Sequence, residues 1–563
     1  MRRVALAAMF LFALALPAAA APDVTIAQGA LAGGDDDGIA VFKDIPFAAP
    51  PVGKLRWRAP QPAPDWQGVR DAGKFGPACV QDPAYPFKPP PQSEDCLSIN
   101  VWSPKTDKAA KLPVMVWIYG GAFRIGSANT PLYDGVDLAK HGVVVVTFNY
   151  RLGWFGFFAH PALKTEDTNE PVGNFGLMDQ IAALQWVRDN IESFGGDPAN
   201  VTIFGESAGG MSVNDLVASP KARGLFAKAI SESGLGMNQL PTLDEIASAD
   251  TAFAARMGVS GSSSRALAEL RRLPATAIAH DEALEDRTPR GGIGDSSPMV
   301  DGALIPDQIS VLFAKGDIAH VPYIAGSNSN EATLMDEVHL TPESMIAALG
   351  DGRDAVRKIY EQNGALTDQE FARQLFGDSL FASAAQGLAA FAAKAGEPAY
   401  TYQFAYVADG LRPDMKGVGH AGELVYVWGL RGLKNDPYFG KLAAAATDKD
   451  KRMVALVQDY WTNFAKSGDP NFGEVPGKSK NIVIADGDNS GVYWNGQKLS
   501  HGEAETRLKD MQSKIPEWPE FSAAAPKTLV FDDETRTVAD FRKAQIEVSF
   551  MGWSKRTGLP PPF

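Results

Sequence analysis

One short segment constrains the fold of this 563-residue chain more than any other. Residues 201–204 (Val-Thr-Ile-Phe) form an apolar run, and Gly205-Glu206-Ser207-Ala208-Gly209 follows it directly. Small residues from Ala208 onward then have the composition of a helix start. A serine on a tight strand-to-helix turn is exposed for nucleophilic attack, and flanking glycines allow close backbone approach. A plain glycine-rich turn is the alternative, but the strand before and the helix after favour a nucleophile at Ser207.

Further apolar runs extend this segment into a sheet. They are rich in β-branched residues and do not alternate with polar ones, which is typical of strands covered on both faces in a mainly parallel sheet. The expected strands occupy residues 114–119, 143–150, 201–204, 321–326 and 399–406. Residues 179–194 carry apolar side chains at helical spacing and end at Gly195-Gly196. The order strand–helix–strand predicts an α/β fold.

The flanking segments complete the expected organisation. Residues 24–47 predict short strands broken by a turn at residues 33–38. Helical stretches such as residues 246–257 and 355–394 are expected to cover the active end of the sheet. No repeat or linker divides the chain, so residues 22–563 are predicted to form one domain with large helical insertions.

Residues 1–21 have the features of a cleaved signal peptide. Arg2 and Arg3 precede an apolar stretch, and small residues then allow cleavage after Ala20 or Ala21. A membrane anchor is the alternative, but about 13 apolar residues are too few to span a bilayer core of about 30 Å. The sequence therefore predicts export to the periplasm or medium of a Gram-negative-like bacterium, without stable membrane insertion.

Charge and cysteine content narrow the possible partners. The formal net charge of −14 repels phosphate backbones, so nucleic acid is not expected to bind. The two cysteines, Cys79 and Cys96, indicate one disulfide in an exported chain. A catalytic thiol is the alternative, and no cysteine motif supports it. Nothing in the sequence calls for a metal or a cofactor.

A glycine-rich loop offers partners for the negative charge that develops in acyl transfer. Tyr119-Gly120-Gly121-Ala122-Phe123 follows the expected strand at residues 114–119, and its glycines leave backbone N–H groups accessible. Read alone, Gly120-Gly121 is a turn. Together with Ser207 it predicts an oxyanion hole formed by the N–H groups of Gly121, Ala122 and Ala208.

Several ordered motifs resemble the type B carboxylesterase family, which includes cholinesterases and bacterial para-nitrobenzyl esterases. The resemblance covers nearly the whole chain after the signal and implies the α/β-hydrolase fold. Its motifs are residues 45–53 (Ile-Pro-Phe-Ala-Ala-Pro-Pro-Val-Gly), 94–102 (Glu-Asp-Cys-Leu-Ser-Ile-Asn-Val-Trp), 149–153 (Asn-Tyr-Arg-Leu-Gly), 176–180 (Gly-Leu-Met-Asp-Gln) and 204–210 (Phe-Gly-Glu-Ser-Ala-Gly-Gly).

The resemblance also implies the partners of Ser207. The family acid is a glutamate after a strand, and Glu331 matches it although Asn330 and Ala332 depart from the family's Asp and Gly. Asp336 and Glu337 lie too far past the strand end to replace it.

For the base, the fold's order of serine, acid and then histidine favours His420, which follows the expected strand at residues 399–406 and matches the family's histidine segment. A surface histidine is the alternative. The other six histidines precede the acid, follow it too closely or lie in a polar segment without a strand: His141, His160, His280, His320, His339 and His501.

The resemblance implies three structural features as well: a Cys79–Cys96 disulfide and buried ion pairs Arg56–Glu94 and Arg151–Asp179. Residues 472–516 depart from the family pattern as an insertion, read as a turn-rich hairpin and a short helix of unknown role.

The expected chemistry is hydrolysis of small carboxylic esters by water through an acyl-enzyme on Ser207, with Glu331 and His420 completing the triad. A non-catalytic binding protein on the same fold would typically lack the nucleophile. A peptidase would need room for a peptide backbone, and no propeller-like repeats precede the hydrolase segment. Cholinesterase activity is disfavoured because residues 81–93 contain Tyr85 and Phe87 but no tryptophan to stack a quaternary ammonium. The sequence does not define the natural ester or the oligomeric state.

Overall fold

The computed structural model describes residues 23–81, 91–166, 171–281, 297–336, 340–412, 415–431, 433, 439–471, 482–485, 491–494, 497–500 and 516–563. The expected signal peptide, the aromatic residues at positions 85 and 87, and two of the seven histidines, His339 and His501, lie outside this part of the chain.

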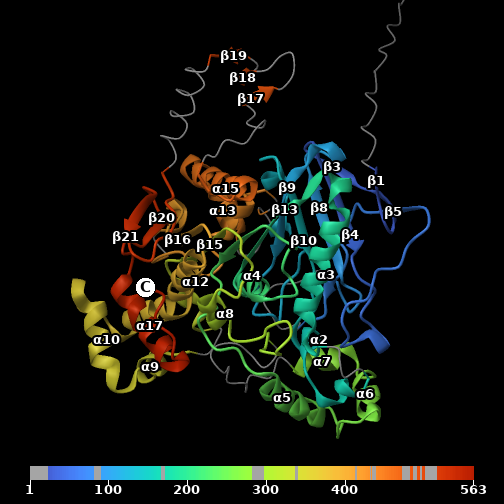
Figure 1. The fold of residues 1–563 in the computed structure, drawn as a ribbon, viewed down its shortest axis with the longest axis horizontal. Helices are drawn as coiled ribbons and strands as arrows, with labels where there is room; N and C mark the ends of the chain where they lie inside the picture. The colour runs from blue at the N-terminus through green and yellow to red at the C-terminus, as the bar shows by residue number, and fades with distance from the viewer. Residues whose placement is uncertain are drawn as a thin grey trace, which may run out of the picture.

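A large twisted sheet forms the centre of the molecule, and Figure 1 shows β20 and β21 at one end and β3 and β4 at the other. Among the described residues the sheet has eleven strands, in the order β21 (Arg536–Ala539), β20 (Lys527–Phe531), β16 (Ala399–Phe404), β15 (Tyr323–Asn328), β14 (Lys228–Glu232), β13 (Gly196–Glu206), β9 (Leu112–Ile118), β10 (Val144–Phe148), β8 (Ser98–Ser103), β4 (Ile39–Pro46) and β3 (Gly34–Asp36).

The strand directions confirm the α/β expectation. All neighbours from β10 across to β20 are parallel, and the antiparallel pairs lie at the two ends. The five predicted strands correspond to β9, β10, β13, β15 and β16, with ends shifted by a few residues. The largest difference is in β13, which begins at Gly196 because that residue already pairs with Leu112 before an irregularity in the register.

The N-terminal segment corrects one expectation. The six residues at 33–38 do not form a single turn, because β3 lies within them and pairs with β4. The turn consists of two residues, Asp37 (φ 58°) and Gly38 (φ 79°), between the paired Asp36 and Ile39. An Asp-Gly pair with both φ angles positive matches the right-handed twist of a hairpin. The strands β1 (Asp23–Ile26) and β2 (Gly29–Ala32), which precede the hairpin, form a separate small sheet with β5 (Val69–Asp71), which follows it.

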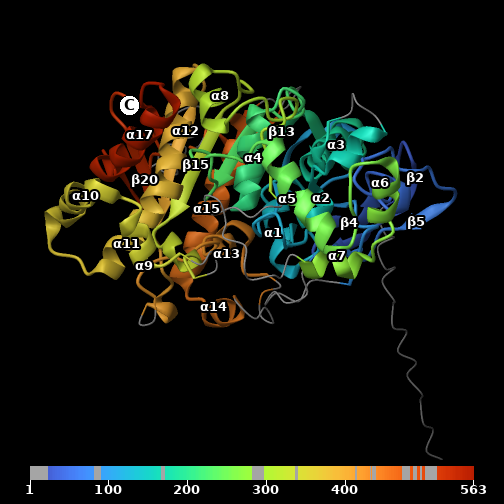
Figure 2. The same ribbon diagram turned by 90° about the horizontal axis from the view of Figure 1, so that it is seen from below.

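Helices cover both faces of the sheet (Figure 2). Ser231 Oγ donates to the carbonyl of Gly210 in α4 (Ala208–Ala218), whereas the next residue, Glu232, accepts from Trp461 in α15 (Asp448–Ser467). Because consecutive residues of a strand point to opposite faces, α4 and α15 lie on opposite sides. The predicted helix at residues 179–194 is α3 (Phe175–Asn190), followed by one 3₁₀ turn that ends at Gly195.

The long stretch at residues 355–394 begins with α10 (Arg353–Tyr360); α11 (Asp368–Phe376) then continues through a π-helical segment, η9 (Gly377–Ala382), into α12 (Ser383–Lys394). Residues in α11 contact the 3₁₀ helix η6 (Glu331–Leu334) after β15, whereas α12 packs against β15 and β16 themselves. The expected helix at 246–257 is α5 (Leu243–Arg256), which begins with a capping box between Thr242 and Glu245.

The remaining helices are short, apart from the C-terminal α17: α1 (Val136–Ala139), α2 (Gly153–Gly156), α6 (Ser264–Leu270), α7 (Ala275–Asp281), α8 (Ile309–Lys315), α9 (Pro342–Ala347), α13 (Leu424–Trp428), α14 (Gly440–Ala445) and α17 (Lys543–Thr557). Within the described residues, no helix combines the length and apolarity needed to cross a bilayer. In the insertion, β17 (Ile482–Ala485) and β18 (Gly491–Trp494) form the predicted hairpin and β19 (Gln497–Leu499) extends it. The short helix expected there lies outside the described residues.

Candidate active site

Ser207 occupies a strained turn between β13 and α4. Its backbone has φ 58° and ψ −122°, a conformation that a residue with a side chain adopts only when its surroundings enforce it. Two hydrogen bonds hold it there: the Ser207 N–H donates to the carbonyl of Glu232 (2.9 Å), and the Met211 N–H donates to the Ser207 carbonyl (2.8 Å). A Cβ on Gly209 would lie 1.9 Å from the Ile118 carbonyl oxygen, so the turn excludes a side chain there.

Glu331 and His420 lie on loops at the carboxyl end of the sheet and meet directly. His420 Nδ1 is 2.7 Å from Glu331 Oε2. The other carboxylate oxygen, Oε1, accepts from Ser233 Oγ (2.6 Å) and from the Asn328 N–H (2.7 Å). The His420 N–H donates to Thr333 Oγ1 (2.9 Å), which fixes the histidine loop against the glutamate loop. The structure therefore brings together the two residues that the sequence selected as acid and base.

The far nitrogen of His420 reaches the turn that carries Ser207. His420 Nε2 lies 3.1 Å from Oε1 of Glu206, the residue immediately before the serine. Between the described residues, Nε2 makes no hydrogen bond, to Ser207 or to any other group. The imidazole thus lies between two carboxylates, with Glu331 on one side and Glu206 on the other.

These buried carboxylates set the electrostatics of the site. Burial lowers the pKa of His420, but the charges of Glu206 and Glu331 outweigh burial and raise it well above its usual value. Burial raises the pKa of Glu206 in turn, with His420 opposing this and Glu331 adding to it. Burial, followed by the charges of Glu206 and Glu331, also raises the pKa of Glu423. Because these groups are buried close together, the charge of each one influences the titration of the others.

The sequence interpretation missed several of these residues. Glu206 stands inside the quoted motif at residues 204–210, and Glu423 lies three residues after His420, so their closeness to Ser207 and His420 in the sequence was the available signal. Ser233, Asn328 and Glu232 had no such signal, because they reach the site only through the neighbouring strands. No three or more His, Cys, Asp or Glu side chains in the described ranges are arranged to hold a metal ion.

The predicted oxyanion loop, residues 119–123, leads into a tight turn at residues 120–126 that packs against the serine. A Cβ on Gly120 would lie 2.6 Å from the Glu206 carbonyl oxygen and 3.0 Å from Ser207 Cβ, so a side chain has no room there and the turn passes close beside the serine. Three consecutive residues have positive φ: Gly121 (114°), Ala122 (55°) and Phe123 (61°). Hydrogen bonds between described residues use neither the N–H groups of Gly121 and Ala122 nor that of Ala208. The geometry leaves these donors available beside Ser207.

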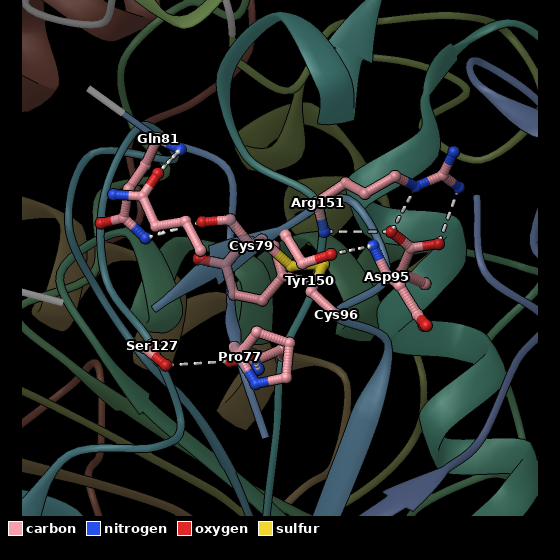
Figure 3. The surroundings of a disulfide bond; sticks show 12 residues. Pro77, Cys79, Gln81, Asp95, Cys96, Ser127, Tyr150 and Arg151 are labelled. Atoms are coloured by element: carbon pink, nitrogen blue, oxygen red, sulfur yellow. Dashed lines mark hydrogen bonds and ion pairs between the residues drawn. A yellow bond between two sulfur atoms is a disulfide. The ribbon is translucent and has the colours of Figure 1, made fainter. Parts of the chain in front are cut away.

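The Cys79–Cys96 disulfide is confirmed, and Figure 3 shows its surroundings. Cys79 and Cys96 are joined, so neither is a free thiol. Both implied ion pairs are also present; Arg151–Asp179 is buried, whereas Glu94 in the Arg56–Glu94 pair is only partly buried. Arg56 binds Glu94 through two hydrogen bonds of 2.7 and 2.5 Å, and Arg151 binds Asp179 through two of 2.7 Å.

Comparison with known proteins places this geometry in a family. The family model described as "Carboxylesterase family" matches residues 20–548. A fumonisin B1 esterase of Sphingopyxis macrogoltabida is 36% identical, over 82% of this chain and 86% of the relative. A para-nitrobenzyl esterase of Bacillus subtilis is 37% identical, over 80% of this chain and 90% of the relative.

Solved structures agree with the sequence relatives. A para-nitrobenzyl esterase structure covers 93% of this chain and 99% of its own, at 32% identity and a TM-score of 0.71. A carboxylesterase of Geobacillus stearothermophilus has the same coverage at 28% identity and a TM-score of 0.74. The family model and the solved structures both match nearly the whole chain. The chain belongs to the carboxylesterase family and is a carboxylic ester hydrolase of the α/β-hydrolase fold.

Proposed function

We propose that the protein is an exported serine carboxylesterase whose acyl-enzyme forms on Ser207, with His420 as base and Glu331 as acid. The position of His420 carries the proposal. Its Nδ1 is 2.7 Å from Glu331, and its Nε2 reaches the strand-to-helix turn beside Ser207, 3.1 Å from Glu206. A nucleophile, a base and an orienting carboxylate in this order meet the requirements of acyl transfer.

In the proposed reaction, His420 Nε2 takes the proton of Ser207 as Oγ attacks the ester carbonyl. Catalytic hydrogen bonds of this kind often form only in the substrate complex. The N–H groups of Gly121, Ala122 and Ala208 stabilise the oxyanion. The bond to the alcohol oxygen then breaks, and His420 returns the proton to the departing alcohol. Water repeats the sequence on the acyl-enzyme and releases the acid.

Replacement of the serine tests the proposal. Ser207→Ala should fold normally, lose turnover of a nitrophenyl ester and lose labelling by a fluorophosphonate probe. Ser522→Ala is a matched control, because Ser522 is exposed and its side chain makes no hydrogen bond with the described residues. Retained turnover in Ser207→Ala would refute the assignment.

A second histidine–glutamate pair, His320 and Glu397, serves as a control for the proposed roles of His420 and Glu331. His320 Nδ1 lies 3.0 Å from Glu397 Oε1, a similar pair, but 60% of the His320 side chain is exposed against 10% for His420. His420→Ala should abolish acylation, whereas His320→Ala should leave it intact. Equal effects of the two changes would contradict a specific role for His420.

Export is supported by the sequence of residues 1–21 and by the disulfide, because disulfides persist in oxidising compartments. The full chain expressed in a Gram-negative bacterium should be recovered outside the cytoplasm, with its N-terminus at Ala21 or Pro22 by mass spectrometry. A cytoplasmic protein that retains its N-terminal residues would contradict export.

A single catalytic domain over residues 22–563 is part of the proposal. The central sheet draws its strands from both ends of the chain, between Gly34 and Ala539, which supports one cooperative unit. Calorimetry should give one unfolding transition, and two separable transitions would argue against it.

The proposed substrates are small carboxylic esters as a class. The similar proteins include a fumonisin B1 esterase and a para-nitrobenzyl esterase, so we propose small carboxylic esters as the class. Nitrophenyl esters of increasing acyl length, compared by kcat/KM, define the preference for the acyl group.

A further inference from the structure

The turn at residues 120–126 needs external support. Two of its residues with side chains, Ala122 and Phe123, hold left-handed backbone conformations that cost free energy. Within the turn, the Arg124 and Ile125 N–H groups both donate to the Gly121 carbonyl (3.0 Å each). The Gly153 N–H donates to the Phe123 carbonyl (2.7 Å), and the buried Phe123 ring packs on Phe157 at 5.2 Å. These contacts hold the start and middle of the turn.

The end of the turn is held by one side chain, Gln81. Its Oε1 accepts from the Gly126 N–H (2.9 Å), and its Nε2 donates to the Gly126 carbonyl (2.9 Å). Both peptide groups of one residue are thus held by a single amide. A Cβ on Gly126 would lie 2.6 Å from the Gly120 carbonyl oxygen, so Gly126 packs directly on the first residue of the turn. By holding Gly126, Gln81 therefore fixes the end of the turn that carries the N–H groups of Gly121 and Ala122.

Gln81 is itself held by the disulfide segment (Figure 3). Its Nε2 also donates to the Cys79 carbonyl (3.0 Å), and its backbone N–H donates to Gln92 Oε1 (3.0 Å). Cys79 is fixed to Cys96 by the disulfide. The Gln81 residue is only 4% exposed, so water does not compete freely for these bonds.

We propose that Gln81 is a positioning residue that couples the Cys79–Cys96 segment to the oxyanion turn and holds the Gly121 and Ala122 N–H groups in their catalytic geometry. The proposal rests on the proposed function, since it assumes that these groups stabilise the oxyanion. An amide is required at this position because Gly126 presents one donor and one acceptor, and a glutamine side chain matches both. An apolar side chain of equal volume fills the same space and makes neither bond.

Gln81→Met tests this role, with Gln61→Met as the matched control, because among the described residues the Gln61 amide binds only the nearby Ala59 carbonyl. Complete removal of one oxyanion donor costs about 10²- to 10³-fold in kcat, and a displaced donor loses only part of that stabilisation. Gln81→Met should therefore lower kcat/KM about ten- to hundredfold and change KM by less than about threefold.

A transition-state analogue separates positioning from packing. A trifluoromethyl ketone forms a tetrahedral adduct on the serine, so its affinity for Gln81→Met should fall by the same factor as kcat/KM. The affinity of a carboxylate product, which forms no adduct, should not change. Wild-type ketone affinity in a folded Gln81→Met would overturn the proposal, and so would a loss of product affinity equal to the loss of ketone affinity.

If Gln81→Met does not fold, Gln81→Glu decides the question, because its carboxylate keeps an acceptor for the Gly126 N–H but presents an oxygen, in place of the donor, to the Gly126 and Cys79 carbonyls. A selective loss of ketone affinity is again expected, and unchanged affinity would overturn the proposal. Ser207→Ala separates the two levels of inference. An inactive Ser207→Ala beside a fully active Gln81→Met refutes the role of Gln81 alone, whereas an active Ser207→Ala refutes the proposed function.

Discussion

Replacing Glu206 by glutamine removes one of the two carboxylates that flank His420 and preserves the size of the side chain. The base in ester hydrolysis is the neutral imidazole, so protonation of His420 should limit activity at low pH. A carboxylate beside the ring stabilises the imidazolium and raises its pKa. Removal of that charge should lower the pKa of His420, and the acid limb of the kcat/KM profile should move to lower pH.

The distance sets the size of the shift. Unit charges separated by the 3.1 Å between His420 Nε2 and Glu206 Oε1 interact by about 5 kcal/mol at an effective dielectric constant of about 20. This corresponds to an upper limit of about 4 pKa units. Burial raises the pKa of Glu206, so its carboxyl is partly protonated over the same range and contributes less than a full charge. We expect a shift of about one to two units.

The assay is kcat/KM for a nitrophenyl ester between pH 5 and 9, corrected for spontaneous hydrolysis. Glu192→Gln is the control, because it removes a charge of the same sign from an exposed pair with Lys111. That variant should reproduce the wild-type profile. An acid limb in Glu206→Gln that stays in place, or moves to higher pH, would refute the electrostatic reasoning.

Three further changes test the surrounding structure. Arg151→Met leaves the Asp179 carboxylate buried without its partner, so urea unfolding should show a loss of about 3–5 kcal/mol, and a loss below 1 kcal/mol would argue against a structural ion pair. Gly209→Ala places a Cβ 1.9 Å from the last carbonyl oxygen of β9, so fluorophosphonate labelling should disappear; normal labelling would show that the turn tolerates a side chain. Reduction of the Cys79–Cys96 disulfide, which closes a loop of 17 positions, should cost about 3 kcal/mol in the same urea assay, and an unchanged midpoint would contradict this.

Local pattern predicted the framework of the site well. The buried run before Ser207 and the small residues after it defined β13, the turn and α4. Glu331 and His420 followed from resemblance and from their order along the chain, and the structure places them 2.7 Å apart. The hairpin at Asp37-Gly38 shows the limit of such reasoning, because a glycine- and aspartate-rich stretch was read as one long turn although only two residues turn.

Contacts between distant segments could not be predicted in this way. Ser233 and Glu331 are 98 positions apart, and Gln81 and Gly126 are 45 apart. The local sequence around one residue of such a pair does not indicate its partner. The two residues come into contact only after the parallel strands and the disulfide have brought their loops together. The contact of Glu206 with His420 was hidden for the same reason, although both residues stood in recognised motifs.

The β3 edge of the central sheet affects how readily the protein aggregates at high concentration. Exposed strand edges invite pairing with a second molecule, and short or charged edge strands oppose it. At one end β3 has only three residues, Gly34–Asp36, and two are aspartates. Arg431 pairs with Asp36 and Asp37 from outside the strand. Two such edges brought together would place like charges opposite each other, so this edge should resist the strand addition that begins β-aggregation.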